Sequence, residues 1–486
     1  MEPVTIAGGG LAGSEAAWQL ALRGIPVMLY EMRPARSTPA HKTDRLAELV
    51  CSNSLKSNAP GAASWLLKEE LRRSGSLLMR LAGECAVPGG AALAVDRERF
   101  SESVTHVLSE HPLITIRREE LREIPSTGPM LIATGPLTSD ALACSLQSLT
   151  GSDNLAFYDA ISPIVDAETV NRDRVFPASR YGKGNGDDYI NCPLNEAEYR
   201  DFYDALRSAE TVEAHLFEDV NYFEACLPIE ELARRGYDTL RFGPMKPVGL
   251  SDPRTGRQPF AVVQLRTENL RSSSYNLVGF QNHLRFPEQA RILRKIPGLE
   301  HAEILRFGQI HRNTFLNAPK LLGPDLRLRA APNVFVAGQL CGVEGYVECI
   351  ATGFLAGVAL AQEAAGKGFA PPPRATALGS LIHYTTHADP ANYQPANISF
   401  DLLPPMEDLP RAVARDRRAR RERQCERALA ELHRWLRELC PDGGKLPEPH
   451  VELTETKQNC HSERSEESRS ESVSNKPERD SSRSLP

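Results

Sequence analysis

Short apolar runs, a glycine turn and a helical periodicity alternate at the beginning of the chain. Val4–Ala7 is an apolar run of strand length, and the apolar residues of segment 14–23 recur at helical spacing. Gly24 suits a helix C-terminus, and Ile25–Tyr30 is a second apolar run. This order of strand, helix and strand predicts one βαβ unit.

Two later segments repeat the pattern of a strand, a turn and a helix. They are GPMLIATGPLTSDAL, residues 128–142, and PNVFVAGQLCGVEGYVECIATGFLAGVALA, residues 332–361. Between them, PFAVVQLRTENLRSSSYNLVGFQNHL, residues 259–284, is typical of two paired strands around a polar turn. Residues 408–440 carry apolar side chains at helical spacing. Strand-turn-helix units therefore lie at both ends of the chain, with a different pattern between them.

The first glycine turn contains a nucleotide-binding pattern. Gly8, Gly10 and Gly13 form the spacing G-x-G-x-x-G between the first strand and the helix. In such a turn the first glycine allows the tight bend, the second lets the backbone approach a pyrophosphate, and the third lets helix and strand pack closely. Glu31 ends the second strand, where a carboxylate can accept hydrogen bonds from a ribose hydroxyl. The alternative is a glycine turn that binds no ligand.

Two further segments favour FAD over NAD as the bound dinucleotide. LIATG, residues 131–135, resembles the strand and turn that close over the cofactor in two-domain flavoproteins. VFVAGQLCGVEGY, residues 334–346, resembles their second strand-turn-helix element. NADPH or NADH would then act as a transient reductant. The residues expected to bind FAD are Gly8, Gly9, Gly10, Leu11, Ala12, Gly13, Glu31, Gly135, Gly338, Gln339, Gly345 and Tyr346.

These elements predict an α/β fold in which a Rossmann-type FAD-binding domain of the two-domain flavoprotein kind is interrupted by an inserted α+β domain. We expect residues 1–165 to form the first part of the FAD-binding domain and residues 166–300 the insert. Residues 301–440 would form the second part, with C-terminal helices. Serine, glutamate and arginine dominate residues 441–486, so we expect a disordered tail there.

Composition narrows the class of protein. The chain has 486 residues, of which 41% are hydrophobic and 25% charged, as in ordinary soluble proteins. No apolar run approaches the ~20 residues of a membrane helix, and the N-terminus lacks the pattern of a signal peptide. We therefore expect a cytoplasmic protein that does not bind membranes. A net charge of -6 argues against a protein that coats nucleic acid without specificity, but it allows RNA binding through a local basic patch.

Ten cysteines are scattered along the chain without a Cys-x-x-Cys pair, which argues against a zinc site, and we predict no metal. One of them, Cys51, lies in the polar segment VCSNSLKSN, residues 50–58, which should form a loop. Lys56 would favour the thiolate of Cys51 if the two side chains are close. A flavin-linked disulfide reductase would need a second cysteine a few residues away, whereas the next one is Cys85. Cys51 therefore acts alone or meets a distant cysteine, for which Cys226 is the candidate because cationic residues follow it.

Several longer motifs run in order from the N-terminus to about residue 440. They are GGGLAGSEAAWQL, ELVCSNSLKSN, ALAVDRERFS, FPASRYGKG, DYINCPLN, CLPIEELARRGYDTLRFGPMKPVGL, YNLVGFQNHLRFPEQ, IPGLEHAEILRFGQIHRNTF and AGQLCGVEGYVECIATG. The stretches RFGPMKPVGL and HRNTF are far more specific than the glycine pattern. Together these motifs resemble those of the folate- and FAD-dependent tRNA uracil-5-methyltransferases (TrmFO).

The resemblance implies an enzyme that forms 5-methyluridine at position 54 in the T loop of tRNA, with no obligate protein partner. It implies 5,10-methylenetetrahydrofolate as carbon donor and FAD reduced by NADPH or NADH as hydride source. Cys51 and Cys226 match the two catalytic cysteines of the family. We expect Cys51 to be the nucleophile and Cys226 the proton-transfer partner, with the order of the two roles open.

Contacts with the T-arm of tRNA would come from basic residues. The expected ones are Arg285, Arg294, Lys295, Arg417, Arg418, Arg420 and Arg421. A solvated helix face is the ordinary explanation of the last four. Three other functions stay open: the same chemistry on a ribosomal RNA uridine, aminomethylation of a wobble uridine by a related flavoprotein, and RNA binding by a flavoprotein without methyl transfer.

Overall fold

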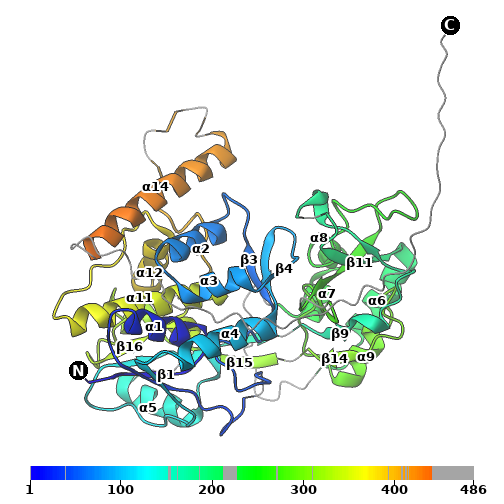
Figure 1. Cartoon of the computed structure of the whole chain (residues 1–486). Coiled ribbons are helices and arrows are strands. Elements are labelled where there is room, and N and C mark those ends of the chain that lie inside the picture. The colour runs from blue at the N-terminus through cyan, green and yellow to red at the C-terminus, as the bar shows by residue number, and fades with distance from the viewer. Residues whose placement is uncertain are drawn as a thin grey trace, which may run out of the picture. The chain divides into compact units, whose positions relative to one another are not determined.

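Figure 1 shows a computed structural model of the protein. It describes residues 2–38, 40–151, 155–160, 162–184, 186–211, 227–269, 272–308, 310–391, 393–406, 409–410, 413 and 415–439, with the backbone alone for 155–160 and 310–314. Cys226 and the expected disordered tail, 441–486, lie outside the described residues.

A parallel sheet takes its strands from both ends of the chain. Its strand order is β16-β7-β1-β2-β6, and every neighbouring pair is parallel. The strands are β1 (Val4–Ala7), β2 (Val27–Tyr30), β6 (Ile114–Arg117), β7 (Met130–Ile132) and β16 (Val334–Val336). The expected βαβ unit and both later strand-turn-helix units are confirmed. Because the strands are parallel, their carboxyl ends meet at one edge, where nucleotides bind in such sheets.

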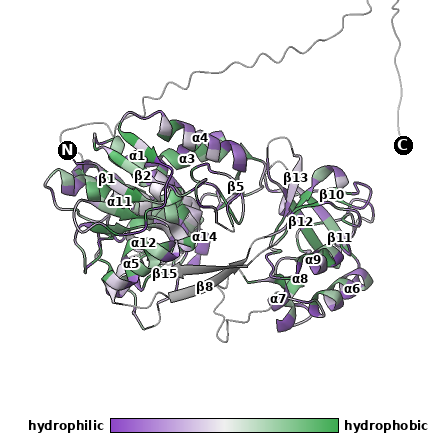
Figure 2. Ribbon diagram, turned by 90° about the horizontal axis from the view of Figure 1, so that it is seen from below, coloured by the Kyte–Doolittle hydropathy of each residue, from purple (hydrophilic) through white to green (hydrophobic). Residues whose placement is uncertain are grey.

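Helix α1 (Leu11–Ala21) follows β1 and packs against α11 (Tyr346–Ala364), as Figures 1 and 2 show. A Cβ atom built on Gly353 of α11 would lie 2.2 Å from the carbonyl oxygen of Ala12, so the two backbones touch. Helix α1 begins at Leu11 instead of the expected Ser14, because the Ser14 N–H already bonds the carbonyl of Gly10 at 2.9 Å. The two ends of the chain are therefore joined through small residues on two helices.

Helix α11 also corrects the expectation that no apolar run is long enough to span a membrane. Its 19 residues pass that test by length and composition, but 78% of the apolar window is buried inside the protein. Burial on all sides explains an apolar helix in a core without any membrane.

The second large sheet lies between the parts of the chain that form the first. Its order is β10-β11-β12-β13-β9-β14, with antiparallel pairs throughout. The strands are β9 (Ile164–Asp166), β10 (Phe176–Pro177), β11 (Tyr189–Leu194), β12 (Ala261–Thr267), β13 (Ser274–Leu277) and β14 (Ile304–Arg306). The two paired strands expected in residues 259–284 are confirmed as β12 and β13. A separate hydrophobic core, which includes Tyr199, Phe202 and Val263, packs this sheet against α6 (Glu196–Arg207) and α7 (Ile229–Arg235).

The remaining elements are a separate two-stranded sheet, several helices and four short turns. They are the pair β8 (Leu155–Ala160) and β15 (Ile310–Phe315), the helices α2 (Ala63–Arg73), α3 (Leu77–Glu84), α4 (Arg97–Ser109), α5 (Asp140–Thr150), α8 (Thr239–Phe242), α9 (Phe286–Leu293), α10 (Ala318–Leu321), α12 (Ala377–His387) and α14 (Arg417–Leu439), and the short 3-10 turns Gly135–Leu137, Ala167–Thr169, Arg180–Gly182 and Gly338–Cys341. Helix α14 lies within the segment 408–440 that we expected to be helical.

The expectation that residues 50–58 form a loop is wrong for half of the segment. Ser54–Ser57 forms strand β3 of a small antiparallel sheet with β5 (Ala92–Val95), which also pairs with β4 (Ala86–Val87). Leu55 is fully buried while its neighbours are half-exposed, as in an edge strand. Polar composition hid this alternation, and Cys51 itself lies just before the strand.

A buried carboxylate fixes the start of α12. Glu70 on α2 is fully buried, and its two carboxylate oxygens accept the N–H groups of Ala377 at 2.7 Å and Leu378 at 2.9 Å. The first N–H groups of a helix have no partner within the helix, and a carboxylate satisfies them while favouring the helix dipole.

We predict that Glu70→Ala lowers the free energy of unfolding by about 1–3 kcal/mol, because two buried N–H groups lose their acceptor. Thermal unfolding followed by circular dichroism measures the change. Glu69→Ala is the matched control, since among the described residues the neighbouring carboxylate forms partly exposed ion pairs with Arg72 and Arg73. Equal melting temperatures for the two variants would contradict this role of Glu70.

Candidate active site

The first glycine turn has the backbone geometry that its spacing predicts. Gly8 has φ +100°, and a Cβ atom there would lie 2.6 Å from the carbonyl oxygen of Ala133. A Cβ atom on Gly13 would lie 1.9 Å from the carbonyl oxygen of Gly8. A Cβ atom on Gly10 would meet no other atom within 4 Å, and its φ of -74° is one that any residue can adopt. The fold therefore requires Gly8 and Gly13, whereas open space beside Gly10 leaves room for a ligand.

Glu31 is held in place beside this turn. One of its carboxylate oxygens accepts the N–H of Gly9 at 3.0 Å, and the other accepts the Nε of Arg33 at 2.8 Å. Burial opposes the charge of Glu31, but the hydrogen bond and charge of Arg33 lower its pKa below the ordinary value. A carboxylate has about four lone-pair sites, so the oxygen bonded to Gly9 can accept one more donor.

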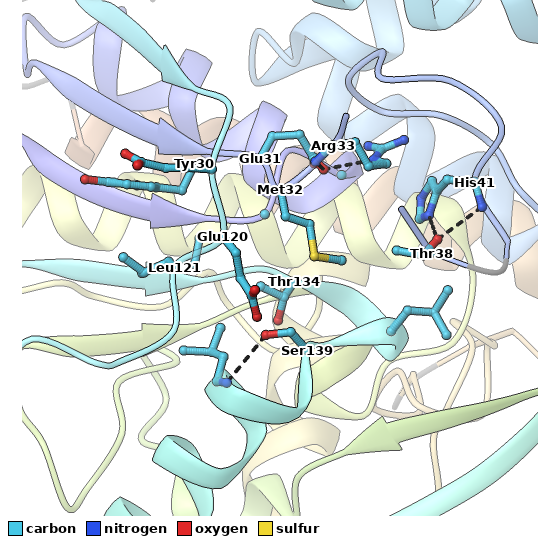
Figure 3. A pocket seen from close by; sticks show the side chains of 16 residues that line it. Tyr30, Glu31, Met32, Arg33, Thr38, His41, Glu120, Leu121, Thr134 and Ser139 are labelled. Atoms are coloured by element: carbon cyan, nitrogen blue, oxygen red, sulfur yellow. Dashed lines mark hydrogen bonds and ion pairs between the residues drawn. The ribbon is translucent and has the colours of Figure 1, made fainter. Parts of the chain in front are cut away.

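A cavity opens between the glycine turn and the ends of β2, β6 and β7 (Figure 3). Its walls combine apolar and polar groups: Ala7, Gly8, Gly10, Tyr30, Glu31, Met32, Arg33, Thr38, His41, Glu119, Glu120, Leu121, Thr134, Leu137, Ser139 and Leu142. Burial and the nearby Arg33 charge lower the pKa of His41 to about 4, so its ring is neutral near pH 7. Apolar walls with a few placed polar groups are typical of a cofactor site, and these residues fit the nucleotide half of a dinucleotide.

The later glycine elements lie against the first one. Gly135 follows β7 with φ +67°, and Gly338 follows β16 with φ +75°. A Cβ atom on Gly338 would lie 3.1 Å from the Cβ of Ala12, and its N–H donates to Thr352 Oγ1 at 2.9 Å. The side chain of Gln339 donates to Glu344 at 3.0 Å. Ala12 and Gly338 are thus brought together by the packing of α1 and α11, and Leu11 is the first residue of α1.

Cys51 is fixed by a side chain from the start of α11. The hydroxyl of Tyr346 lies 2.9 Å from Cys51 Sγ, 2.9 Å from the Cys51 N–H and 3.1 Å from the Ser52 N–H. Gly345, with φ +112°, directs the chain into this contact. The structure therefore joins the cysteine segment to the distal glycine element, although 295 residues separate Cys51 from Tyr346.

Two arginines, the half-buried Arg97 and the buried Arg266, hold the rest of the cysteine segment. Arg97, the first residue of α4, donates to the carbonyls of Leu49 at 2.7 Å and Val50 at 3.2 Å. Arg266 on β12 donates to Ser52 Oγ at 2.7 Å and to Asn53 Oδ1 at 2.8 Å. We call these two arginines and Tyr346 the clamp on segment 49–53.

The charges around Cys51 are mostly cationic. Arg97 and Arg306 both interact electrostatically with Cys51, and Arg97 also forms an ion pair of 2.9 Å with Glu268. The amino group of Lys56, which would favour the thiolate if it lay close, forms an ion pair of 3.0 Å with the buried Glu348 of α11.

The basic residues expected to contact RNA fall into two groups. Arg285 and Lys295 flank α9 and form ion pairs with Glu210 at 3.3 Å and Asp201 at 2.7 Å, which reduces their net charge; Arg294 ends the same helix.

The second group lies on α14, where helical geometry separates its members. Arg417, Arg420 and Arg421 line a polar cavity together with Lys56, Ala62, Ala63, Ser64, Asn397, Ile398, Ser399, Phe400, Asp401 and Gln424. Arg418 is outside that lining and forms an ion pair with Glu422 at 3.0 Å. The cavity shares Lys56 with the ion pair next to Gly345, so it lies close to the cysteine segment.

Arg97, Arg266 and Glu268 were not among the residues expected from the sequence. Arg97 stands in the motif ALAVDRERFS, but nothing in that motif distinguishes it from Arg99. Arg266 lies on a strand of the second sheet, far from the glycine patterns. Their importance follows only from the folded contacts.

Comparison with known proteins places this geometry in a family. Residues 3–368 match the family described as GIDA, glucose inhibited division protein A. The chain is 60% identical over 438 residues to the methylenetetrahydrofolate--tRNA-(uracil-5-)-methyltransferase TrmFO of Solibacter usitatus, covering 89% of this chain and 98% of that protein. It is 58% identical over 434 residues to the protein of the same name from Koribacter versatilis, with the same coverage.

Among solved structures, Aquifex aeolicus GidA has a similar fold. The TM-score is 0.65 at 16% sequence identity, and the match covers 90% of this chain and 75% of that one. The predicted Rossmann-type flavoprotein fold is therefore confirmed. Identity over nearly the full length of the curated relatives shows that this chain belongs to the GIDA family and, within it, to the methylenetetrahydrofolate--tRNA-(uracil-5-)-methyltransferases TrmFO.

Proposed function

We propose that this chain forms 5-methyluridine at position 54 in the T loop of tRNA, with 5,10-methylenetetrahydrofolate as carbon donor and NADPH or NADH as reductant of bound FAD. The observation that carries the proposal is the clamp, which holds Cys51 against the distal glycine element. The names of the relatives support methyl transfer from folate to tRNA uracil.

The residues around the first glycine turn would hold FAD. The N–H groups at the start of α1 and the open space at Gly10 suit a pyrophosphate. Glu31 has one carboxylate position available for a ribose hydroxyl. Gly135, Gly338, Gln339, Gly345 and Tyr346 would face the remainder of the cofactor. When bound in its reduced form, FAD supplies the hydride that converts a methylene group into a methyl group.

A thiol nucleophile would overcome the low reactivity of uracil at carbon 5. Carbon 5 of uracil is a poor nucleophile, but a bond between Cys51 Sγ and carbon 6 makes an enolate whose carbon 5 attacks the methylene carbon. Cys226 would then remove the proton from carbon 5 while the bond between the methylene carbon and its donor nitrogen breaks, which leaves an exocyclic methylene group. Addition of a hydride to that methylene carbon would restore the double bond between carbons 5 and 6 and expel Cys51 as a thiolate. The cationic groups near Cys51 favour the thiolate that begins this sequence.

The α14 cavity would bind phosphates of the T-arm, because it gathers Arg417, Arg420 and Arg421 beside Lys56. Arg285, Arg294 and Lys295 would give a second, weaker contact. The target uridine must leave its stack to reach the thiol.

We propose a cytoplasmic enzyme that needs no other protein and no membrane, with a FAD-binding domain of residues 1–165 and 301–440 and an insert of residues 166–300. A ribosomal RNA uridine is the alternative substrate for the same chemistry. The names of the relatives favour methyl transfer over wobble-uridine aminomethylation or RNA binding alone.

We predict that Gly10→Ala folds but loses at least about 90% of its bound FAD, because a methyl group would occupy the space beside the backbone that the pyrophosphate needs. Flavin absorbance per mole of protein measures the loss. Gly83→Ala is the matched control, since its Cβ atom also meets nothing within 4 Å but lies on α3. A normal flavin content in Gly10→Ala would show that the cofactor is placed wrongly.

Cys51→Ala and Cys226→Ala should each lower methylation by about 1,000-fold or more, because residues that act as a unit each lose most of the rate. Both should keep FAD. Methylation is measured as 5-methyluridine by mass spectrometry on tRNA with uridine at position 54, and tRNA with cytidine there is the substrate control. Covalent adducts between protein and RNA are measured on denaturing gels. An adduct in Cys51→Ala but not in Cys226→Ala would reverse the two roles. Cys144→Ala, which changes an exposed cysteine, serves as the control. Full activity of Cys51→Ala or of Cys226→Ala would show that the replaced cysteine has no catalytic role.

Replacing Arg417, Arg420 and Arg421 together by alanine should weaken tRNA binding and lower the slope of log Kd against log salt by about 2. Replacement of Arg418 and Arg423 should have a smaller effect, since both already form ion pairs along the exposed face of α14. Filter binding at several salt concentrations compares the two sets. Equal effects of the two sets on tRNA binding would show that all these arginines attract tRNA through their charge in general, and not through the cavity.

A further inference from the structure

The hydroxyl of Tyr346 has a fixed hydrogen-bond direction. It lies 2.9 Å from the Cys51 N–H, 3.1 Å from the Ser52 N–H and 2.9 Å from Cys51 Sγ. A phenolic oxygen has one hydrogen to donate and two lone pairs to accept with. The two backbone N–H groups can only donate, so they occupy both lone pairs. The hydroxyl hydrogen is then left to point at the sulfur.

This geometry points to a specific role: we propose that Tyr346 is a positioning residue that donates a hydrogen bond to the thiolate of Cys51. The inference rests on the proposed function only in so far as Cys51 reacts as a thiolate. A donor aimed at a charged atom stabilises the charged form over the neutral one. The same hydroxyl fixes the two N–H groups of the segment, so it sets both the position and the charge of the sulfur.

Tyr346 can keep this role over the working pH range. Burial, followed by the nearby Cys51, raises the pKa of the Tyr346 hydroxyl well above its ordinary value. The tyrosine therefore stays protonated when the thiol ionises, and the hydrogen remains on the donor.

The charged groups around Cys51 come from three further elements. Arg97 of α4 and Arg306 of β14 favour the thiolate through their positive charges. Arg266 of β12 donates a hydrogen bond to Ser52 Oγ. Glu268 opposes them but is held in its ion pair with Arg97. A substitution of Tyr346 leaves all four of these residues in the chain, so the contribution of the hydroxyl can be measured against an unchanged set of charges.

The test is the rate of alkylation of Cys51 by iodoacetamide against pH in the FAD-loaded protein, followed by mass spectrometry of the peptide that contains Cys51. Tyr346→Phe should move the midpoint of the profile upward by about one pH unit and lower the rate at pH 7 by about 10-fold. Tyr384→Phe is the matched control, since it removes a hydroxyl that donates only to the carbonyl of Gln394 among the contacts described.

Two readouts separate this role from a structural one. If Tyr346→Phe only loosened the segment, the limiting rate at high pH would change while the midpoint stayed in place, and that result would overturn the proposal. An unchanged profile would overturn it as well. A raised midpoint with a normal melting temperature supports it. If the midpoint moves but Cys51→Ala still methylates tRNA, the inference about Tyr346 stands and the proposed role of Cys51 in catalysis fails.

Discussion

The fixed position of segment 49–53 is the constraint on which the site depends. A short polar segment with a reactive sulfur has little apolar surface of its own to hold it. Here Arg97, Arg266 and Tyr346 supply its hydrogen bonds, and they come from a helix after the first β-strands, from the second sheet and from the start of α11. The thiol is thus placed only when three distant parts of the chain have folded together.

The same dependence explains why the chain returns to its first sheet after residue 330. Strand β16 joins the parallel sheet beside β7, and α11 packs on α1 through glycine and alanine. This close packing brings Gly338 against Ala12 and presents Tyr346 to Cys51. Helix α11 therefore holds the thiol at one end and packs along α1, which follows the glycine turn that lines the nucleotide cavity.

Much of the fold could be predicted because its signals are local. Gly8 and Gly13 are required by contacts within their own turn and with the residues that directly follow β7, and such requirements leave a recognisable spacing. The contacts of Cys51 could not be predicted, because Arg97 and Arg266 have no local pattern that marks them. The strand at Ser54–Ser57 was missed because polar residues lie on both sides of Leu55. The basic cluster on α14 was seen as a unit, whereas helical geometry turns Arg418 away from the cavity lined by its neighbours.

The most direct test of the proposed methyl transfer is to label the carbon that the folate donates. The purified FAD-loaded protein is incubated with NADPH, tRNA transcript and 5,10-methylenetetrahydrofolate carrying ¹³C in its methylene group, and the nucleosides are analysed by mass spectrometry. We expect labelled 5-methyluridine that maps to the T loop and whose formation depends on both folate and reductant. Unlabelled uridine throughout, or label in an aminomethyl group at the wobble position, would contradict it.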